Sequence, residues 1–240
     1  MTDLFEVWVY LAEQPLLWLT VTLISYVLAH ALFRYSGEFA LLNPVLVAVT
    51  LLVAVLLLTE TTYSQYFAGA QFVHFLLGPA TVALAVPLYA QAHQLRRLWL
   101  PLGVALTVGA LSAIISAFLL GVGLGLEHEM VMSLLSKSAT TPVAMGVAER
   151  VGGIPPLTAV FVILTGITGA IAGLPLLKLI GERDAGTKGF AMGVASHGIA
   201  TATAFQHSDR AGAYAGLGMG LNAALTAILV PTLLWLLTFF

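Results

Sequence analysis

Long stretches without a charged side chain set the organisation of this chain. Asp, Glu, Lys and Arg are absent from the largely apolar residues 14–33, 39–59, 61–95, 98–126, 151–177, 189–208 and 211–240. A helix of about 20 apolar residues crosses the hydrocarbon core of a bilayer, and a helix satisfies its own backbone groups in lipid. The pattern therefore predicts an all-α polytopic integral membrane protein with about 7–8 transmembrane segments.

The polar residues inside these stretches divide simple spans from interrupted ones. We expect simple spans at about 15–34, 41–58, 98–121, 157–178 and 211–238. A polar connection at 59–70 should precede a span at about 71–90, which Gly78-Pro79 and Pro87 should kink or break. Segments 130–149 and 189–206 are apolar but interrupted. We predict broken or re-entrant helices there, and whether they cross the membrane completely stays open.

A weak internal similarity links two of the interruptions. Pro79–Ala85 and Ser138–Ala144 are both breaks rich in small residues, each with a hydroxyl side chain and a proline. Paired breaks of this kind point to a transporter binding site at the interface of two repeats. We therefore treat 1–240 as one transmembrane domain, with 15–125 and 126–240 as possible halves of an inverted repeat, although chance matching of small residues remains the alternative.

Composition narrows the class of protein further. Hydrophobic residues make up 60% of the chain and charged residues 8%, which nearly excludes a water-soluble enzyme. The net charge of -2, with only nine Lys and Arg, argues against nucleic acid as a partner. There is no cysteine, no zinc-binding HExxH motif and no Gly-x-Ser-x-Gly nucleophile motif. We expect no metal, no cofactor and no enzymatic activity.

Lys137 is the basic residue within an otherwise apolar segment. It lies eight residues after Glu129, about 12 Å along a helix, and an ionisable residue at such depth is a functional candidate. Hydroxyl groups and a proline surround it, so we predict a small-anion site formed by Lys137, Ser138, Thr140, Thr141 and Pro142. The alternative is a lysine that extends to the membrane surface beside hydroxyls bonded only to the backbone.

His197 marks the second interruption. Its neighbours Ser196, Gly198 and Thr201 would contact the hydroxyl or oxo group of a bound substrate, and the imidazole could carry a coupling proton. A buried neutral histidine bonded to a carbonyl is the alternative. The other candidate binding residues are Pro79, Thr81, Asn43 and Asn222, and the two asparagines could instead join helices.

Glycines recur at one helical spacing in the last span. Gly212, Gly216 and Gly220 lie at i, i+4 and i+8, which predicts a helix face that another helix approaches closely.

Several motifs together resemble one family. Ser138–Met145, Gly152–Gly166 and Ala195–Ala202 carry the likeness, together with Leu76–Tyr89 and Leu42-Asn43-Pro44, and it extends over about residues 15–238. These segments resemble the LrgB/CidB family. That resemblance implies a bacterial cytoplasmic (inner) membrane protein. The family includes antiholin-like and holin-like regulators of murein hydrolase and cell death, the transporter half of the plastid glycolate/glycerate translocator, and bacterial members linked to pyruvate movement.

The sequence departs from the family pattern at three positions. Ser136 replaces a usual proline, Ala200 replaces a glycine, and Thr203 stands where an arginine often occurs. If that arginine binds the anion in other members, either Lys137 must do more here or the substrate differs.

Together, the residues and the resemblance predict a carrier of small monocarboxylates such as glycolate, glycerate, lactate or pyruvate. It would work by alternating access, with proton coupling left open. The alternative function is an antiholin-like regulator of murein hydrolase export and cell lysis. It would act through a holin-like membrane protein of the LrgA/CidA type, which the resemblance names as a partner. Homo-oligomerisation stays open.

Overall fold

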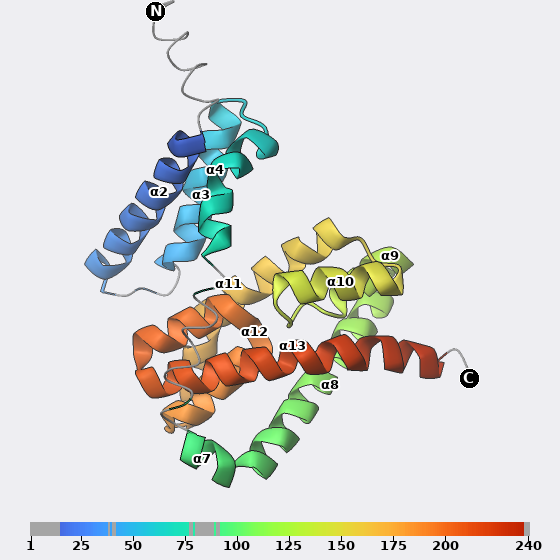
Figure 1. Ribbon diagram of the computed structural model, residues 1–240. Coiled ribbons are helices and arrows are strands. Elements are labelled where there is room, and N and C mark those ends of the chain that lie inside the picture. The colour runs from blue at the N-terminus through green and yellow to red at the C-terminus, as the bar shows by residue number, and fades with distance from the viewer. Residues whose placement is uncertain are drawn as a thin grey trace, which may run out of the picture. The chain divides into compact units, whose positions relative to one another are not determined.

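The computed structural model describes residues 15–37, 39, 42–76, 79, 89 and 92–237, and all regular elements in these residues are helices. The contacts divide the chain into two compact units, Met1–Ala83 and Leu84–Phe240. The first unit contains α2 (Pro15–Tyr35), α3 (Pro44–Leu58) and α4 (Tyr63–Phe75) (Figure 1). The second contains α7 (Ala92–Arg97), α8 (Trp99–Gly123), α9 (His128–Leu134), α10 (Thr141–Val151), α11 (Pro155–Leu179), α12 (Ala185–His207) and α13 (Asp209–Leu237).

The N-terminal unit is built around an aromatic contact between α2 and α4. Trp18 is completely buried, and its ring meets that of Tyr66 edge-on, with the ring centroids 6.1 Å apart. The hydroxyl of Thr22 donates a hydrogen bond to the Tyr66 hydroxyl over 3.3 Å. These contacts hold Tyr63–Phe75 in a helix, so the prediction of a polar connection over 59–70 was wrong for most of its length.

Asn43 has a local structural role in this unit. Its side-chain oxygen accepts hydrogen bonds from the backbone N–H groups of Val45 and Leu46 and so caps α3, with Pro44 in the first helical turn. Most of the predicted span at 71–90, including Thr81 and Pro87, lies outside the described residues. Pro79 is described and is exposed.

The C-terminal unit is organised by α12 and α13, which lie side by side (Figure 1), and the start of α12 lies beside the start of α13, where Asp184 pairs with Arg210. Their close approach depends on glycines of α12. A Cβ atom on Gly189 would overlap the carbonyl of Ala211, and one on Gly193 would overlap the carbonyl of Ala215. Backbone therefore packs directly on backbone in this pair, as in other close contacts between membrane helices.

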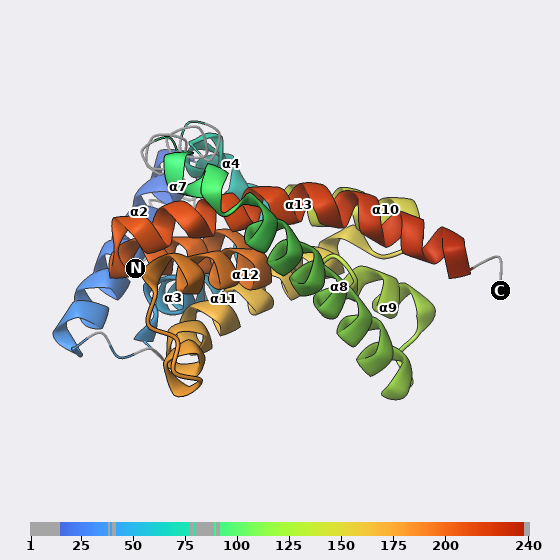
Figure 2. The same ribbon diagram turned by 90° about the horizontal axis from the view of Figure 1, so that it is seen from below.

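α8 crosses this pair and carries the chain to α9 (Figure 2). At that end, an apolar cluster joins four helices through Ile114 of α8, Val131 of α9, Val147 of α10 and Val230 of α13. Ser133 adds a polar link, because its Oγ accepts a hydrogen bond from the Ile154 backbone N–H over 2.8 Å. The helices on either side of the interruption at 135–140, α9 and α10, are thus both packed against neighbouring helices.

The long helices agree with most of the predicted simple spans. Among the described residues, four helices are long and apolar enough to cross a membrane: α2, α8, α11 and α13. The apolar helix α3 is shorter. Segments 130–149 and 189–206, predicted to be interrupted, are indeed broken. The first is divided into the short helices α9 and α10, and α12 contains non-helical backbone at Ser196 and His197.

The glycine face predicted on the last span has only part of its expected role. A Cβ atom on Gly212 would overlap the ring of Phe205, so this glycine does permit close packing. Gly216 is half-buried, whereas Gly220 is exposed and a Cβ atom there would have nothing within 4 Å. Within the C-terminal unit, the close approach of α12 and α13 depends on the glycines of α12 and not on Gly220.

Candidate functional site

The interruption that carries Lys137 is a tight, internally bonded connection between α9 and α10. Turn-like backbone bonds run from Lys137 N–H to the Leu134 carbonyl and from Ala139 N–H to the Ser136 carbonyl, over 3.2 and 2.9 Å. The buried Ser136 hydroxyl donates to the Ala144 carbonyl over 3.0 Å, which closes the turn onto α10. Hydrogen bonds within the connection and to α10 therefore fix its conformation.

Helix α13 fixes this connection from outside. Asn222 is fully buried, and its side-chain N–H donates to the Ser138 carbonyl over 3.0 Å. Its Oδ1 atom is buried and has no hydrogen-bond partner. Asn222 thus joins α13 to the Lys137 connection, as the helix-joining interpretation of this residue predicts.

The break in α12 depends on an unusual backbone at His197. This residue has φ 43° and ψ −139°, a conformation that is costly for any residue other than glycine. The Nε2 atom lies 2.8 Å from the Val162 carbonyl oxygen; because a carbonyl only accepts, Nε2 carries the hydrogen and donates. The Thr201 hydroxyl, one helical turn further on, donates a hydrogen bond to the His197 carbonyl over 2.8 Å.

Two glycines of α11 make room for this break. A Cβ atom on Gly166 would lie 2.6 Å from Cε1 of His197, and one on Gly169 would overlap the Ser196 hydroxyl. The imidazole is 4% exposed and is held against α11. Ser196 is also buried, but it lines a cavity, whereas His197 is not among the residues lining the cavities described below.

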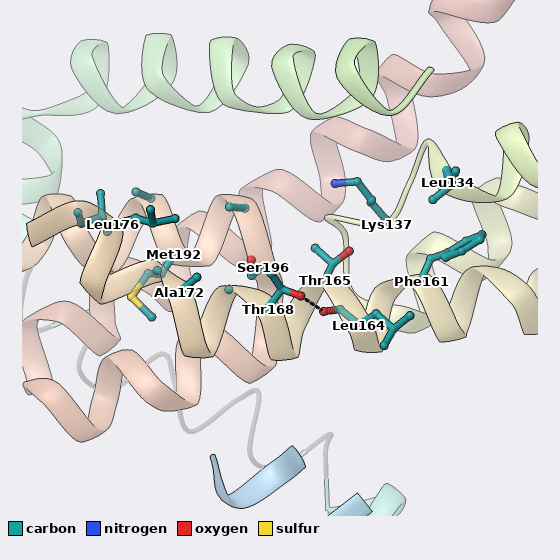
Figure 3. Close-up of a pocket in the computed structure, with 15 residues that line it drawn as sticks. Leu134, Lys137, Phe161, Leu164, Thr165, Thr168, Ala172, Leu176, Met192 and Ser196 are labelled. Atoms are coloured by element: carbon teal, nitrogen blue, oxygen red, sulfur yellow. Dashed lines mark hydrogen bonds between the residues drawn. The ribbon is translucent and has the colours of Figure 1, made fainter. Parts of the chain in front are cut away.

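The first cavity has a volume of about 550 Å³ and lies between α11 and α12, and Lys137 is among the residues that line it. Figure 3 shows polar side chains gathered midway along it: Ser196 of α12, Thr165 and Thr168 of α11, and Lys137. Apolar side chains, among them Leu176 and Phe161, lie beyond this polar group on either side (Figure 3). A polar group flanked by apolar walls is the usual arrangement of a small-molecule site.

A second cavity, of about 480 Å³, lies between α8 and α12. It shares Lys137, Ala191 and Ala195 with the first cavity, so these residues form the common boundary. Ser138 lines it near Lys137, and Asp184 lines it from the start of α12. Lys137 therefore faces both cavities and supplies the one positive charge among the described residues that line them.

The structure thus brings together part of the predicted binding set. Lys137, Ser138 and Ser196 line the cavities, although they come from separate interruptions. The remaining predicted residues of this unit support the two breaks or lie beside them, and none lines these two cavities: Thr140, Thr141, Pro142, His197, Gly198, Thr201 and Asn222. Asn43, Pro79 and Thr81 belong to the N-terminal unit.

Pro142 has a more specific role than a helix breaker. It lies in the first turn of α10, where proline is favoured. The N-cap residue of α10, Thr140, makes no side-chain capping bond to the helix. The positive end of the α10 dipole therefore lies within a few residues of Lys137 without a side-chain cap from Thr140, which adds to the positive potential near the connection.

The binding set predicted from the sequence lacks the hydroxyl groups that α11 contributes. Thr165 and Thr168 line the first cavity, and the Thr168 hydroxyl donates to the Leu164 carbonyl over 2.8 Å (Figure 3). Their signal is the combination with Gly166 and Gly169, which places hydroxyls and small residues together within one apolar helix. Among the described residues, no group of three or more His, Cys, Asp or Glu side chains could hold a metal ion.

Comparisons of the sequence with known proteins point to one family. Residues 22–236 match the LrgB-like family. The uncharacterized protein YxaC of Bacillus subtilis (strain 168) is 37% identical over 81% of this chain and 85% of its own length. The antiholin-like protein LrgB of Bacillus cereus (strain B4264) is 30% identical over 90% of this chain and 94% of its own length.

A relative with the same name in Bacillus anthracis (strain CDC 684 / NRRL 3495) is also 30% identical, over the same shares of the two chains. No solved structure matches the chain. The candidate membrane spans and these bacterial relatives together indicate that the chain is an integral membrane protein. Since the match covers nearly the whole sequence, the chain belongs to the LrgB-like family.

Proposed function

We propose that this protein carries small monocarboxylates across a bacterial cytoplasmic membrane. The observation that carries the proposal is the position of Lys137, which stands on a helix break and faces two cavities. A charged side chain inside a membrane costs at least about 2.5 kcal/mol, and non-helical backbone at such depth is tolerated where it lines a cavity or is buried in protein. An anion in the cavities would neutralise the lysine.

The hydroxyl groups beside Lys137 suit a hydroxy or oxo acid. The ammonium group would bind the carboxylate, while Ser196, Thr165 and Thr168 would face the hydroxyl or oxo group midway along the first cavity. Glycolate, glycerate, lactate and pyruvate all present these two functions within a few bonds. The cavities are large enough for any of them, and so the substrate class is defined by chemistry rather than by size.

In this proposal His197 acts mainly as a positioning residue. Its hydrogen bond to Val162 holds the break that places Ser196 at the cavity. Proton coupling through the imidazole stays a prediction. It requires that the pH dependence of uptake change in His197→Gln, which keeps a hydrogen-bond donor but does not titrate.

Transport can be tested in proteoliposomes with labelled glycolate or pyruvate. We expect saturable uptake by the wild type and at least a tenfold loss in Lys137→Gln, because hydrogen bonds to charged groups contribute about 1.5–3 kcal/mol. Lys178→Gln is the matched control, since it makes the same chemical change at an exposed residue at the end of α11. Equal uptake by the two variants would show that Lys137 does not bind the substrate.

A second candidate function is an antiholin-like regulator of cell lysis, and the names of the relatives support it more directly than they support transport. The exposed Gly220 favours it structurally, because α13 has open space there for a helix of another protein. Gly220→Leu should block such an approach without disturbing the fold. A bacterial strain lacking its own LrgB-like protein provides the assay.

The two functions predict opposite results in that strain. If the protein is a regulator that acts through helix contacts, Gly220→Leu fails to restore the normal rate of autolysis and Lys137→Gln restores it. If it acts through carboxylate transport, Lys137→Gln fails and Gly220→Leu succeeds.

A further inference from the structure

The outer end of the second cavity carries an ion pair that the proposed function does not yet use. Asp184 lines the cavity, and its Oδ2 atom lies 2.9 Å from an Arg210 guanidinium nitrogen. The guanidinium also lies over the ring of Tyr214, 5.8 Å from its centroid, and Tyr214 lines the same cavity. Both charged side chains are partly exposed, Arg210 by 45% and Asp184 by 41%, so a solute can reach them.

The cavity connects this ion pair with Lys137. Asp184 stands at the start of α12, and Ala195 lines the cavity beside Lys137 eleven residues later, about 16 Å along the helix. Between these ends, the lining from α12 consists of Thr187, Phe190, Ala191 and Val194. Thus the described lining has an acidic group at one end, a basic group at the other, and no charge between them.

An entering carboxylate would be repelled by Asp184 if this group stood alone. Arg210 compensates that charge, and its planar guanidinium matches the geometry of a carboxylate. Resting on the proposed function, we propose that Arg210 is the outer anion-binding residue of this cavity. Asp184 is the internal carboxylate that occupies Arg210 until a substrate carboxylate replaces it and moves on to Lys137.

Asp184 keeps hydrogen-bond partners when Arg210 binds the substrate instead. Its Oδ1 atom accepts hydrogen bonds from the backbone N–H and the hydroxyl of Thr187, over 2.8 and 3.1 Å, as the N-cap of α12. These bonds do not involve Arg210. The exchange therefore breaks the ion pair and leaves the helix cap intact.

The competing explanation is a structural tie between the start of α12 and the start of α13. The two explanations differ in the sign of the effects of two substitutions. Asp184→Asn keeps a good N-cap residue and removes the competing charge, so an anion site at Arg210 should bind substrate better. Arg210→Gln removes the anion site itself. A purely structural tie would be weakened by both substitutions in the same direction.

The experiment measures KM and Vmax for carboxylate uptake in proteoliposomes containing the full chain. Arg183→Gln is the matched control, because Arg183 is an exposed neighbour that lines neither cavity. We expect Arg210→Gln to raise KM about two- to fivefold with little change in Vmax. Asp184→Asn should lower KM about two- to threefold, and Arg210→Lys, which keeps the charge, should recover most of the wild-type affinity.

The outcomes separate this inference from the function on which it rests. If wild-type protein shows no saturable uptake, the carrier function itself is overturned, and the role of Arg210 with it. If uptake is saturable and depends on Lys137, but Arg210→Gln has the KM of Arg183→Gln, only the role of Arg210 is overturned. Equal increases in KM for Arg210→Gln and Asp184→Asn, with lowered melting temperatures in both, would likewise refute it in favour of a structural tie.

Discussion

Adding one methyl group to Gly193 tests the packing that holds the candidate site together. In Gly193→Ala, the new Cβ atom would overlap the carbonyl of Ala215 on α13. Backbone cannot rotate away as a side chain can, so α12 and α13 must separate. Gly220→Ala is the matched control, because its Cβ atom would have nothing within 4 Å.

The expected difference follows from two opposing terms. Replacing glycine by alanine within a helix gains about 0.8–1.0 kcal/mol from helix propensity, and Gly220→Ala should show this gain alone. Overpacking a close contact costs about 1–3 kcal/mol, and for Gly193→Ala the cost should exceed the gain because the overlap is with backbone. The two variants should differ by the overpacking cost, again about 1–3 kcal/mol.

The assay is thermal unfolding of the purified protein in detergent, followed by tryptophan fluorescence. For a chain of this size, about 1 kcal/mol corresponds to about 2–4 °C, so Gly193→Ala should melt several degrees below Gly220→Ala. The reasoning would be refuted if Gly193→Ala melted at or above the temperature of Gly220→Ala.

Three further predictions concern the break in α12 and the ion pair at its start. Gly169→Ala should displace Ser196 and reduce substrate affinity in uptake assays, because its Cβ atom would overlap the Ser196 hydroxyl; unchanged affinity would contradict the placement of Ser196. His197→Gly should melt about 2–12 °C above His197→Ala, the reverse of the order in an ordinary helix, since φ 43° costs alanine about 1–3 kcal/mol. Hydrogen bonds from Thr187, and the charge of Arg210, hold the pKa of Asp184 below its ordinary value. The ionised Asp184 carboxylate therefore stabilises the folded state. This contribution is fully present above the unfolded-state pKa of about 3.9 and is lost as pH falls through the lower folded-state pKa. The difference in melting temperature between wild type and Asp184→Asn should be constant near neutral pH and shrink below about pH 4.

The sequence predicted the simple spans well because their signal is local. A run of apolar residues bounded by charges needs no knowledge of neighbours, and so the ends of α2, α8, α11 and α13 lie within a few residues of the predicted ends. The region 59–70 was mispredicted for the opposite reason. Its helix depends on the contact of Tyr66 with Trp18, 48 residues away, which polar composition does not reveal.

The candidate site was predicted in part for similar reasons. Lys137 and Ser196 stand out because polar residues in apolar segments are costly, and both line the first cavity. The direction in which His197 points depends on Gly166 of another helix, and so the sequence could not show that its imidazole is held against α11. The same limit applies to glycine spacing, which marks a smooth helix face but does not identify the helix that packs on it.

The central claim is that Lys137 holds a carboxylate inside the helix bundle. Its most direct test is the binding of pyruvate and glycolate to the purified protein in lipid nanodiscs, measured by isothermal titration calorimetry. The account predicts saturable binding to the wild type and to Lys178→Gln, and none to Lys137→Gln at the same concentrations. Saturable binding of equal affinity to Lys137→Gln, or no binding to the wild type, would contradict it.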